Sequence, residues 1–150
     1  MIALYCSPPP AVSMGTGWKI EEQDKCSLLL TEIDLNKMSF ETCLKEGESW
    51  ITGEEKLRRH AKAKHVLADA KIGQILFEEK DQKILEYLYK KYGYSHFELP
   101  GTILRSPDNR CYTLYLHKSL DRWDLDYDHF ECGRNADFPS LVMETREQNL

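Results

Sequence analysis

Residues 102–130 read TILRSPDNRCYTLYLHKSLDRWDLDYDHF, and this stretch decides the fold. Apolar and polar residues alternate along Arg110–His117 and again along Trp123–Phe130, which is the period of a strand with one buried face. The tetrapeptide Ser106–Asn109 has the composition of a tight turn. We therefore predict an antiparallel β-meander at the C-terminal end of the chain, with Ser140–Met143 as a candidate last strand.

Two helices are predicted upstream of the meander. Thr52–Glu55 has the sequence of a capping box, so the first helix should begin at Thr52. Its apolar face has spacings of three, four and seven, and comprises Leu57, Ala61, Ala68, Ile72, Ile75 and Leu76. A second, shorter helix should begin near Asp81 and end at Gly93, because glycine readily adopts the left-handed conformation that follows a helix.

The chain of 150 residues is long enough for a single domain, 1–150, with its own hydrophobic core. Residues 1–50 are weakly patterned, and we expect an arm or partial layer there, with Cys26–Ile33 as a buried strand. Met1–Cys6 is interpreted as a short strand or a loose tail. Residues 51–100 should be helical and 101–150 should form the meander, so the predicted fold class is α+β, two helices packed on a C-terminal antiparallel meander.

Composition excludes several classes of protein. The hydrophobic content of 41% excludes intrinsic disorder, and no apolar run approaches the roughly 18 residues of a transmembrane helix. The net charge of −5 disfavours nucleic acid as a partner, and no segment indicates a membrane partner. The five cysteines include no C-x-x-C pair, and the first residues lack the pattern of a secretory signal. We expect a reduced, cytoplasmic protein whose oligomeric state the sequence leaves open.

Three aspartates in the last predicted hairpin share one face of their strand. Asp124, Asp126 and Asp128 should point outward while Trp123, Leu125 and Tyr127 point inward. Three interpretations are open: a solvated strand face, a recognition surface, and a divalent-metal or acid/base catalytic site. A calcium-binding EF-hand loop is excluded, because the positions that need Gly and Glu hold His129 and Asn135.

The run Lys56–His65 is basic and lies on the first predicted helix. Its charges point in several directions around the helix, so we interpret it as a solvated face and not as a phosphate site. His60 and His65 are five residues apart, which does not place two ligands on one helical face, and we interpret both as surface histidines. The cysteines are interpreted as buried or incidental, because no sequence pattern pairs one with a base.

The segment Arg122–Phe130, continued through Pro139–Met143, resembles the C-terminal variable region of small bacterial proteins that look like targets of diversity-generating retroelements. Their pattern is Trp-x-Trp-x-Tyr-x-Trp-Leu followed, after about eight residues, by Pro-Ser-Ala-Val-Leu. The positions that match here are Trp123, Tyr127, Pro139, Ser140 and Val142. The likeness extends upstream to Ile51–Glu55 and Gly101–Pro107, so it covers roughly residues 51 to 143.

The resemblance implies that the x positions contact a ligand on a fixed scaffold. Carried over position by position, the ligand-binding residues would be Asp124, Asp126, Asp128, Asn135, Asp137 and Phe138. Better-known variable proteins of such elements have a C-type-lectin fold, so the resemblance also admits that fold.

These observations lead to one expectation and one alternative. We expect a binding module for an unknown protein or small-molecule ligand, with no catalytic residue, metal ligand or cofactor, that presents an acidic and variable surface on its C-terminal strands. The alternative is a small metal-dependent or acid/base hydrolase that uses Asp124, Asp126 and Asp128.

Overall fold

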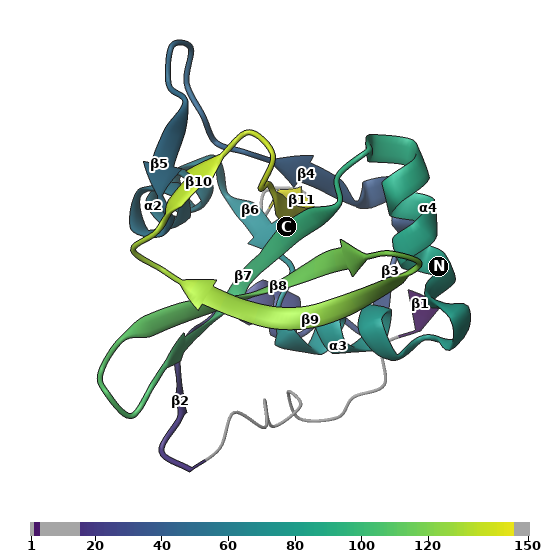
Figure 1. The fold of residues 1–150 in the computed structure, drawn as a ribbon, viewed down its shortest axis with the longest axis horizontal. Helices are drawn as coiled ribbons and strands as arrows, with labels where there is room; N and C mark the ends of the chain where they lie inside the picture. Colours follow the sequence, from purple (N-terminus) through teal and green to yellow (C-terminus); the bar gives the residue numbers. More distant parts are fainter. Residues whose placement is uncertain (1, 4–15, 146–150) are drawn as a thin grey trace.

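A computed structural model describes residues 2–3 and 16–145 and shows an α+β fold built on one mixed sheet (Figure 1). Its strand order is β4 (Ser39–Glu41), β11 (Ser140–Thr145), β7 (His96–Arg105), β8 (Cys111–Ser119) and β9 (Arg122–His129). Strand β2 (Lys19–Gln23) pairs with the C-terminal part of β7, whereas β11 pairs with its N-terminal part. Strand β6 (His65–Leu67) pairs with β11. Two further pairs are β1 (Ile2–Ala3) with β3 (Glu32–Ile33), and β5 (Trp50–Thr52) with β10 (Gly133–Asn135).

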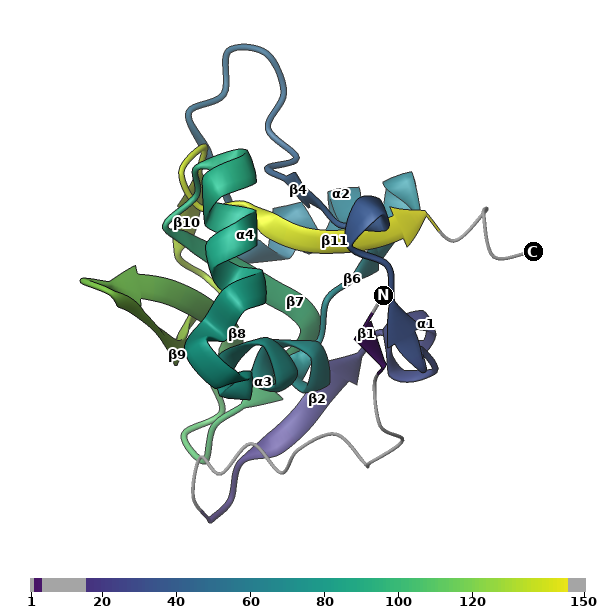
Figure 2. The same ribbon diagram turned by 90° about the vertical axis from the view of Figure 1, so that its right-hand side faces the viewer.

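Helices lie on both faces of this sheet. The structure contains α1 (Lys25–Leu28), α2 (Gly53–Ala63), α3 (Ala70–Glu78) and α4 (Lys83–Tyr92), with short 3-10 turns at Leu35–Lys37 and Lys80–Gln82. Helix α3 contacts β7, β8, β9 and α4, and these elements enclose the hydrophobic core (Figure 2). Helix α2 instead contacts β5, β6 and β10. None of the helices in the described part of the chain combines the length and apolar composition that crossing a membrane requires.

Several local predictions are confirmed. Thr52 caps α2, because its Oγ1 accepts a hydrogen bond from the backbone N–H of Glu55 at 3.1 Å. Helix α4 ends at Gly93, whose φ of 83° is the left-handed conformation expected there. The two hairpins of the meander are present as β7–β8 and β8–β9, both antiparallel.

The single long helix predicted from Thr52 to Leu76 is wrong. The chain leaves α2 at Lys64, which adopts a left-handed φ of 60°, and then forms the short strand β6. A new helix, α3, starts after Asp69, whose Oδ1 accepts the backbone N–H of Ile72 at 3.0 Å. The apolar positions therefore belong to two helices, with Ala68 between β6 and α3, although their spacing fits one helix.

The first third of the chain also differs from the prediction. Cys26–Ile33 is not one strand, because Asp24 caps a helical turn there by accepting the N–H groups of Cys26 and Ser27. Strands β2 and β4 join the main sheet and do not form a separate arm. Of Met1–Cys6, residues 2–3 form β1, and the remaining four lie outside the described residues.

The main sheet contains further strands besides those of the predicted meander. Strand β11 does not follow β9 at the sheet edge but lies between β4 and β7, parallel to β7, with Ser140 opposite Glu98. The sheet is therefore mixed. This insertion brings the C-terminal strand against α2 and β6, where the candidate site lies.

Candidate metal centre

A buried carboxylate and two buried cations lie on the face of the sheet opposite the hydrophobic core. Glu98 comes from β7, where its neighbours Phe97 and Leu99 point into the core. Its Oε1 lies 2.9 Å from Lys56 Nζ on α2, and its Oε2 lies 3.1 Å from Arg134 Nε on β10. All three side chains are at most 2% exposed.

These ions are satisfied by further hydrogen bonds. Lys56 Nζ donates to the carbonyl of Phe138 at 2.9 Å. The Arg134 guanidinium donates to Thr113 Oγ1 at 3.0 Å and to the carbonyls of His129 and Cys132. Burial alone would raise the pKa of Glu98, but Lys56 and Arg134 hold that pKa below its ordinary value. Glu98 is therefore ionised, and the three side chains carry one uncompensated positive charge.

A chain of hydrogen bonds links this group to His60 on α2. Ser140 Oγ donates to Glu98 Oε1 at 2.9 Å, because an ionised carboxylate can only accept. His60 Nε2 lies 2.9 Å from the same Ser140 oxygen and must donate to it, since the serine hydrogen is already used. The proton of the neutral His60 ring is thereby fixed on Nε2, and Nδ1 presents a lone pair.

Two other side chains that can bind a metal lie next to His60. His65 Nδ1 lies 2.9 Å from His60 Nδ1, on the lone-pair side. Cys43 Sγ lies 3.4 Å from Nδ1 and 3.7 Å from Nε2, so it is beside the ring and not in line with the lone pair. The three ligand atoms are all within 4.8 Å of one another. Among the described residues they form a group of sulfur and imidazole donors, which suit zinc and related transition metals.

Local backbone geometry brings these residues together. The left-handed Lys64 turns the chain at the end of α2, so that His65 at the start of β6 returns toward His60. Cys43 lies after β4 and itself has a φ of 60°. Arg59 fixes this loop on α2, because its guanidinium donates to the carbonyl of Cys43 at 2.8 Å and to Glu48 at 2.9 Å.

A metal ion would need small rearrangements of this group. With bonds of about 2.0–2.1 Å to nitrogen and 2.3 Å to sulfur, the ligands of a tetrahedral zinc lie roughly 3.3–3.6 Å apart. The two Nδ1 atoms, now at the hydrogen-bond distance of 2.9 Å, would separate by a few tenths of an ångström, and the Cys43 side chain would rotate to bring its sulfur from beside the His60 ring toward the lone pair. The hydrogen bond from His60 to Ser140 is the kind of outer contact that orients a ligating histidine.

The protonation states argue against a thiolate nucleophile activated by histidine. Burial raises the pKa of Cys43 to about 11. Burial, with the charge of Lys56, lowers the pKa of His60 to about 3. A cysteine–histidine catalytic pair needs the opposite shifts, a low thiol pKa beside a cationic imidazole. A bound metal cation would suit these two side chains, because it lowers the pKa of a thiol that binds it and requires a neutral imidazole.

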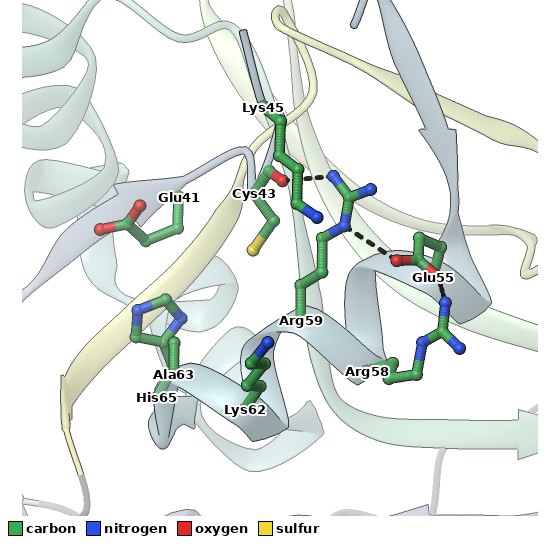
Figure 3. Close-up of a pocket in the computed structure, with 9 residues that line it drawn as sticks. All are labelled: Glu41, Cys43, Lys45, Glu55, Arg58, Arg59, Lys62, Ala63 and His65. Atoms are coloured by element: carbon green, nitrogen blue, oxygen red, sulfur yellow. Dashed lines mark hydrogen bonds and ion pairs between the residues drawn. The ribbon is translucent and has the colours of Figure 1, made fainter.

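A pocket of about 580 Å³ lies beside this group, and the buried His60 is not part of its lining. Cys43 and His65 contribute to its wall, and Figure 3 shows the Cys43 sulfur pointing toward the side of the pocket where His65 and Glu41 lie. The remaining lining residues are Lys45, Glu55, Arg58, Arg59, Lys62 and Ala63. Three protein ligands beside an open pocket are typical of zinc sites that keep a coordination position for water or substrate.

The predicted aspartates lie elsewhere, on the outer face of β8 and β9. Asp126 is exposed, and Asp124 and Asp128 are half-buried. Across the strand pair, Asp124 is opposite His117 and Asp126 is opposite Tyr115, so these residues share one face.

The predicted inward face of β9 is correct only in part. Trp123 is 0% exposed and belongs to the core, and Leu125 packs against it, but Tyr127 is 42% exposed. Tyr127 lies on the inward face, opposite the core residue Leu114, but its expected burial is wrong: among the described residues, its ring neighbours are Trp18 and Tyr112, and they leave it partly exposed.

The remaining predicted ligand-binding residues separate into two groups. Asn135 and Asp137 are exposed, and Asn135 Oδ1 accepts the backbone N–H of Asp137 at 2.9 Å. Phe138 is buried, and its ring lies against Tyr115 and over Lys56. Phe138 therefore covers the buried ions and has little surface left for a ligand.

The interpretation of His60 and His65 as surface histidines is wrong, since His60 is fully buried and His65 is half-buried. Lys56, in the same basic run, is also buried, so this run is not simply a solvated face. One signal could have indicated the site. The spacing His60-x₄-His65 lies within the range common among zinc-binding sequences, and Cys43 precedes it.

Comparisons of the chain with protein-family models, with curated proteins and with solved structures gave no match.

Proposed function

We propose that this protein binds a transition-metal ion, with zinc as the best fit, through Cys43 Sγ, His60 Nδ1 and His65 Nδ1. The observation that carries the proposal is the convergence of these three atoms within 4.8 Å, with the His60 lone pair directed by the Glu98–Ser140 hydrogen bonds. Sulfur with two imidazoles is a donor set for zinc and not for calcium or magnesium.

The site has the characteristics of a metal centre that binds water or a ligand, and not of a structural metal site. Structural zinc sites have four protein ligands and are closed, whereas this group supplies three and borders an open pocket. The hydrophobic core contains none of the three residues, so the fold has a source of stability independent of the ion.

Metal content of the purified protein tests the proposal. The wild-type chain, loaded with zinc and passed through a desalting column, should retain one equivalent by elemental analysis. Cys43→Ala and His65→Ala should each reduce zinc affinity by at least roughly ten- to a hundred-fold, as expected for loss of a ligand or its support. Circular dichroism should show that both variants remain folded.

Matched controls come from the same residue types elsewhere in the chain. Cys132→Ala removes an exposed cysteine and His117→Ala removes a histidine of the outer strand face, so both should bind zinc as the wild type does. A wild-type protein that retains no zinc, cobalt or nickel would refute the proposal. Zinc retained unchanged by the Cys43→Ala, His65→Ala double variant would refute it too.

We propose a second candidate function for the outer face of β8 and β9, which is recognition of an unknown protein or small-molecule ligand. Support comes from the sharing of one sheet face by Asp124, Asp126 and Asp128 with Tyr115 and His117. The resemblance to variable proteins of retroelements assigns the same aspartates to ligand contact. A reverse transcriptase gene beside this one, with a near-duplicate of the segment encoding residues 120–140, would support the proposal; a neighbourhood without both would count against it.

A hydrolase that uses the three aspartates as metal ligands is less favoured by the geometry. Among the described residues, their carboxylates are not part of a group of ligand atoms within 4.8 Å. Alternate positions of one strand are separated by about 6.6 Å, too far for three carboxylates to share one ion. Calorimetric titration with Ca²⁺ or Mg²⁺ should show no site tighter than roughly millimolar that depends on Asp126.

A further inference from the structure

The pocket in front of the proposed metal centre has the size and charge of a small-molecule site. Its volume of about 580 Å³ lies within the range of pockets that enclose ligands of moderate size. Four cations line it, Lys45, Arg58, Arg59 and Lys62, against the two carboxylates Glu41 and Glu55 (Figure 3).

Most of the negative charge in this lining is already neutralised. Glu55 forms ion pairs with both Arg58 and Arg59. Arg59 is further paired with Glu48 and is thereby held against the loop of Cys43. Lys45 and Lys62 are exposed at the pocket, so the lining attracts an anion more strongly than a cation.

The buried positive charge behind the proposed metal centre also favours binding of an anion. The Lys56–Glu98–Arg134 group has one positive charge in excess, and Ser140 joins Glu98 of this group to His60 by hydrogen bonds. A divalent ion held by one thiolate and two neutral imidazoles adds a further net positive charge. Two uncompensated positive charges favour an anion at the remaining coordination position.

Glu41 does not supply that anion within the described structure. It lines the pocket but does not belong to the group of ligand atoms within 4.8 Å. The fourth position of a tetrahedral ion is therefore left to a molecule that enters through the pocket.

We infer that the centre accepts a small oxyanion, a carboxylate or phosphate group, with one oxygen on the metal ion and the others facing Lys45 and Lys62. This inference rests on the proposed metal function. The aliphatic stems of the two lysines and the methyl of Ala63 would contact the rest of the ligand.

Cobalt-loaded protein provides the test, because its absorption spectrum reports the ligands and coordination number of the ion. Saturable spectral changes are expected on titration with acetate or with inorganic phosphate, and the more effective of the two identifies the preferred headgroup. The Lys45→Gln, Lys62→Gln double variant should weaken anion binding by roughly five- to thirty-fold, as expected for two exposed charges, with cobalt affinity unchanged.

The Lys83→Gln, Lys90→Gln double variant is the matched control, because both lysines are exposed on α4 and remote from the pocket lining. Failure to bind cobalt would refute the metal function itself. Cobalt binding with no response to either anion would refute only the oxyanion inference. An equal loss of anion affinity in the control variant would also refute it, because the effect would then be one of net charge.

Discussion

His60 is a neutral ring between the buried ions and the proposed metal ion, and its two nitrogens have different roles. Nε2 donates to Ser140, which donates to Glu98, and this leaves the Nδ1 lone pair to accept from His65 Nδ1–H in the metal-free protein. A protonated imidazole could not keep this arrangement, because Nδ1 would lose its lone pair. The buried excess charge at Lys56 opposes such protonation.

Acid should therefore destabilise the metal-free protein through His60. Burial lowers the pKa of His60 to about 3, from an ordinary value of 6.5, so the unfolded chain binds a proton that the native state does not. Stability should fall as the pH decreases from about 6.5 towards about 3, and His60 should have no effect above that window. The loss at the acidic limit is on the order of 5 kcal/mol.

Urea unfolding at a series of pH values, with a chelator present, measures this loss. His60→Gln is the control, because its amide can still donate to Ser140 but does not titrate. The variant should be less stable at neutral pH and should show a flatter pH profile. Identical slopes for the two proteins would contradict the assignment.

At the scale of elements, the junction between α2 and β6 decides whether the site exists. A continuous helix would place His60 and His65 on different faces, since five residues correspond to about 500° of rotation. Lys64 breaks the helix with a φ of 60° and a ψ of 33°, a conformation that costs a residue with a side chain more than it costs glycine.

Lys64→Gly should consequently stabilise the protein by up to about 1 kcal/mol, since glycine is the preferred residue at a left-handed helix end. Ala61→Gly, within α2, is the comparison and should destabilise by about 1 kcal/mol. Thermal melts of both variants measure the difference. A loss of stability in Lys64→Gly would show that the turn depends on the lysine side chain.

Sequence predicted the elements whose signals are local. The Thr52 cap, the glycine at the end of α4 and the alternation along β8 and β9 each involve neighbouring residues. The split of the long helix was missed because the apolar stripe continues across β6 with a compatible spacing. The candidate metal centre was missed because it joins Cys43 to residues 17 and 22 positions away, and only the insertion of β11 beside β7 places Ser140 against His60.

At the scale of the whole molecule, the sheet separates two regions. Its face toward α3 and α4 is apolar, with Trp123 packed against Phe97 and Tyr89. Its other face carries the buried ions, the proposed metal-binding group and, on β9, the outward aspartates. Stability should therefore depend mainly on the first face and function on the second.

Trp123→Ala and Asp126→Ala test this separation within one strand. Trp123 is fully buried, so its deletion should cost roughly 3–5 kcal/mol. Asp126 is exposed, and its deletion should change stability by no more than about 0.5 kcal/mol. Chemical denaturation of the two variants gives both values, and losses of similar size would contradict the division of roles.

Removal of the metal ion should leave the molecule folded, because the hydrophobic core includes neither Cys43, His60 nor His65. Zinc should nevertheless raise the melting temperature, since a ligand that binds only the native state stabilises it by mass action. At a zinc concentration about one hundred times Kd, the gain should be roughly 2.7 kcal/mol, or about 5–10 °C for a chain of this size. Calorimetric melts with zinc and with chelator measure the shift, and the Cys43→Ala, His65→Ala double variant should melt cooperatively with no shift. A metal-free protein without a cooperative transition would show instead that the ion maintains the fold, and the centre would then be structural.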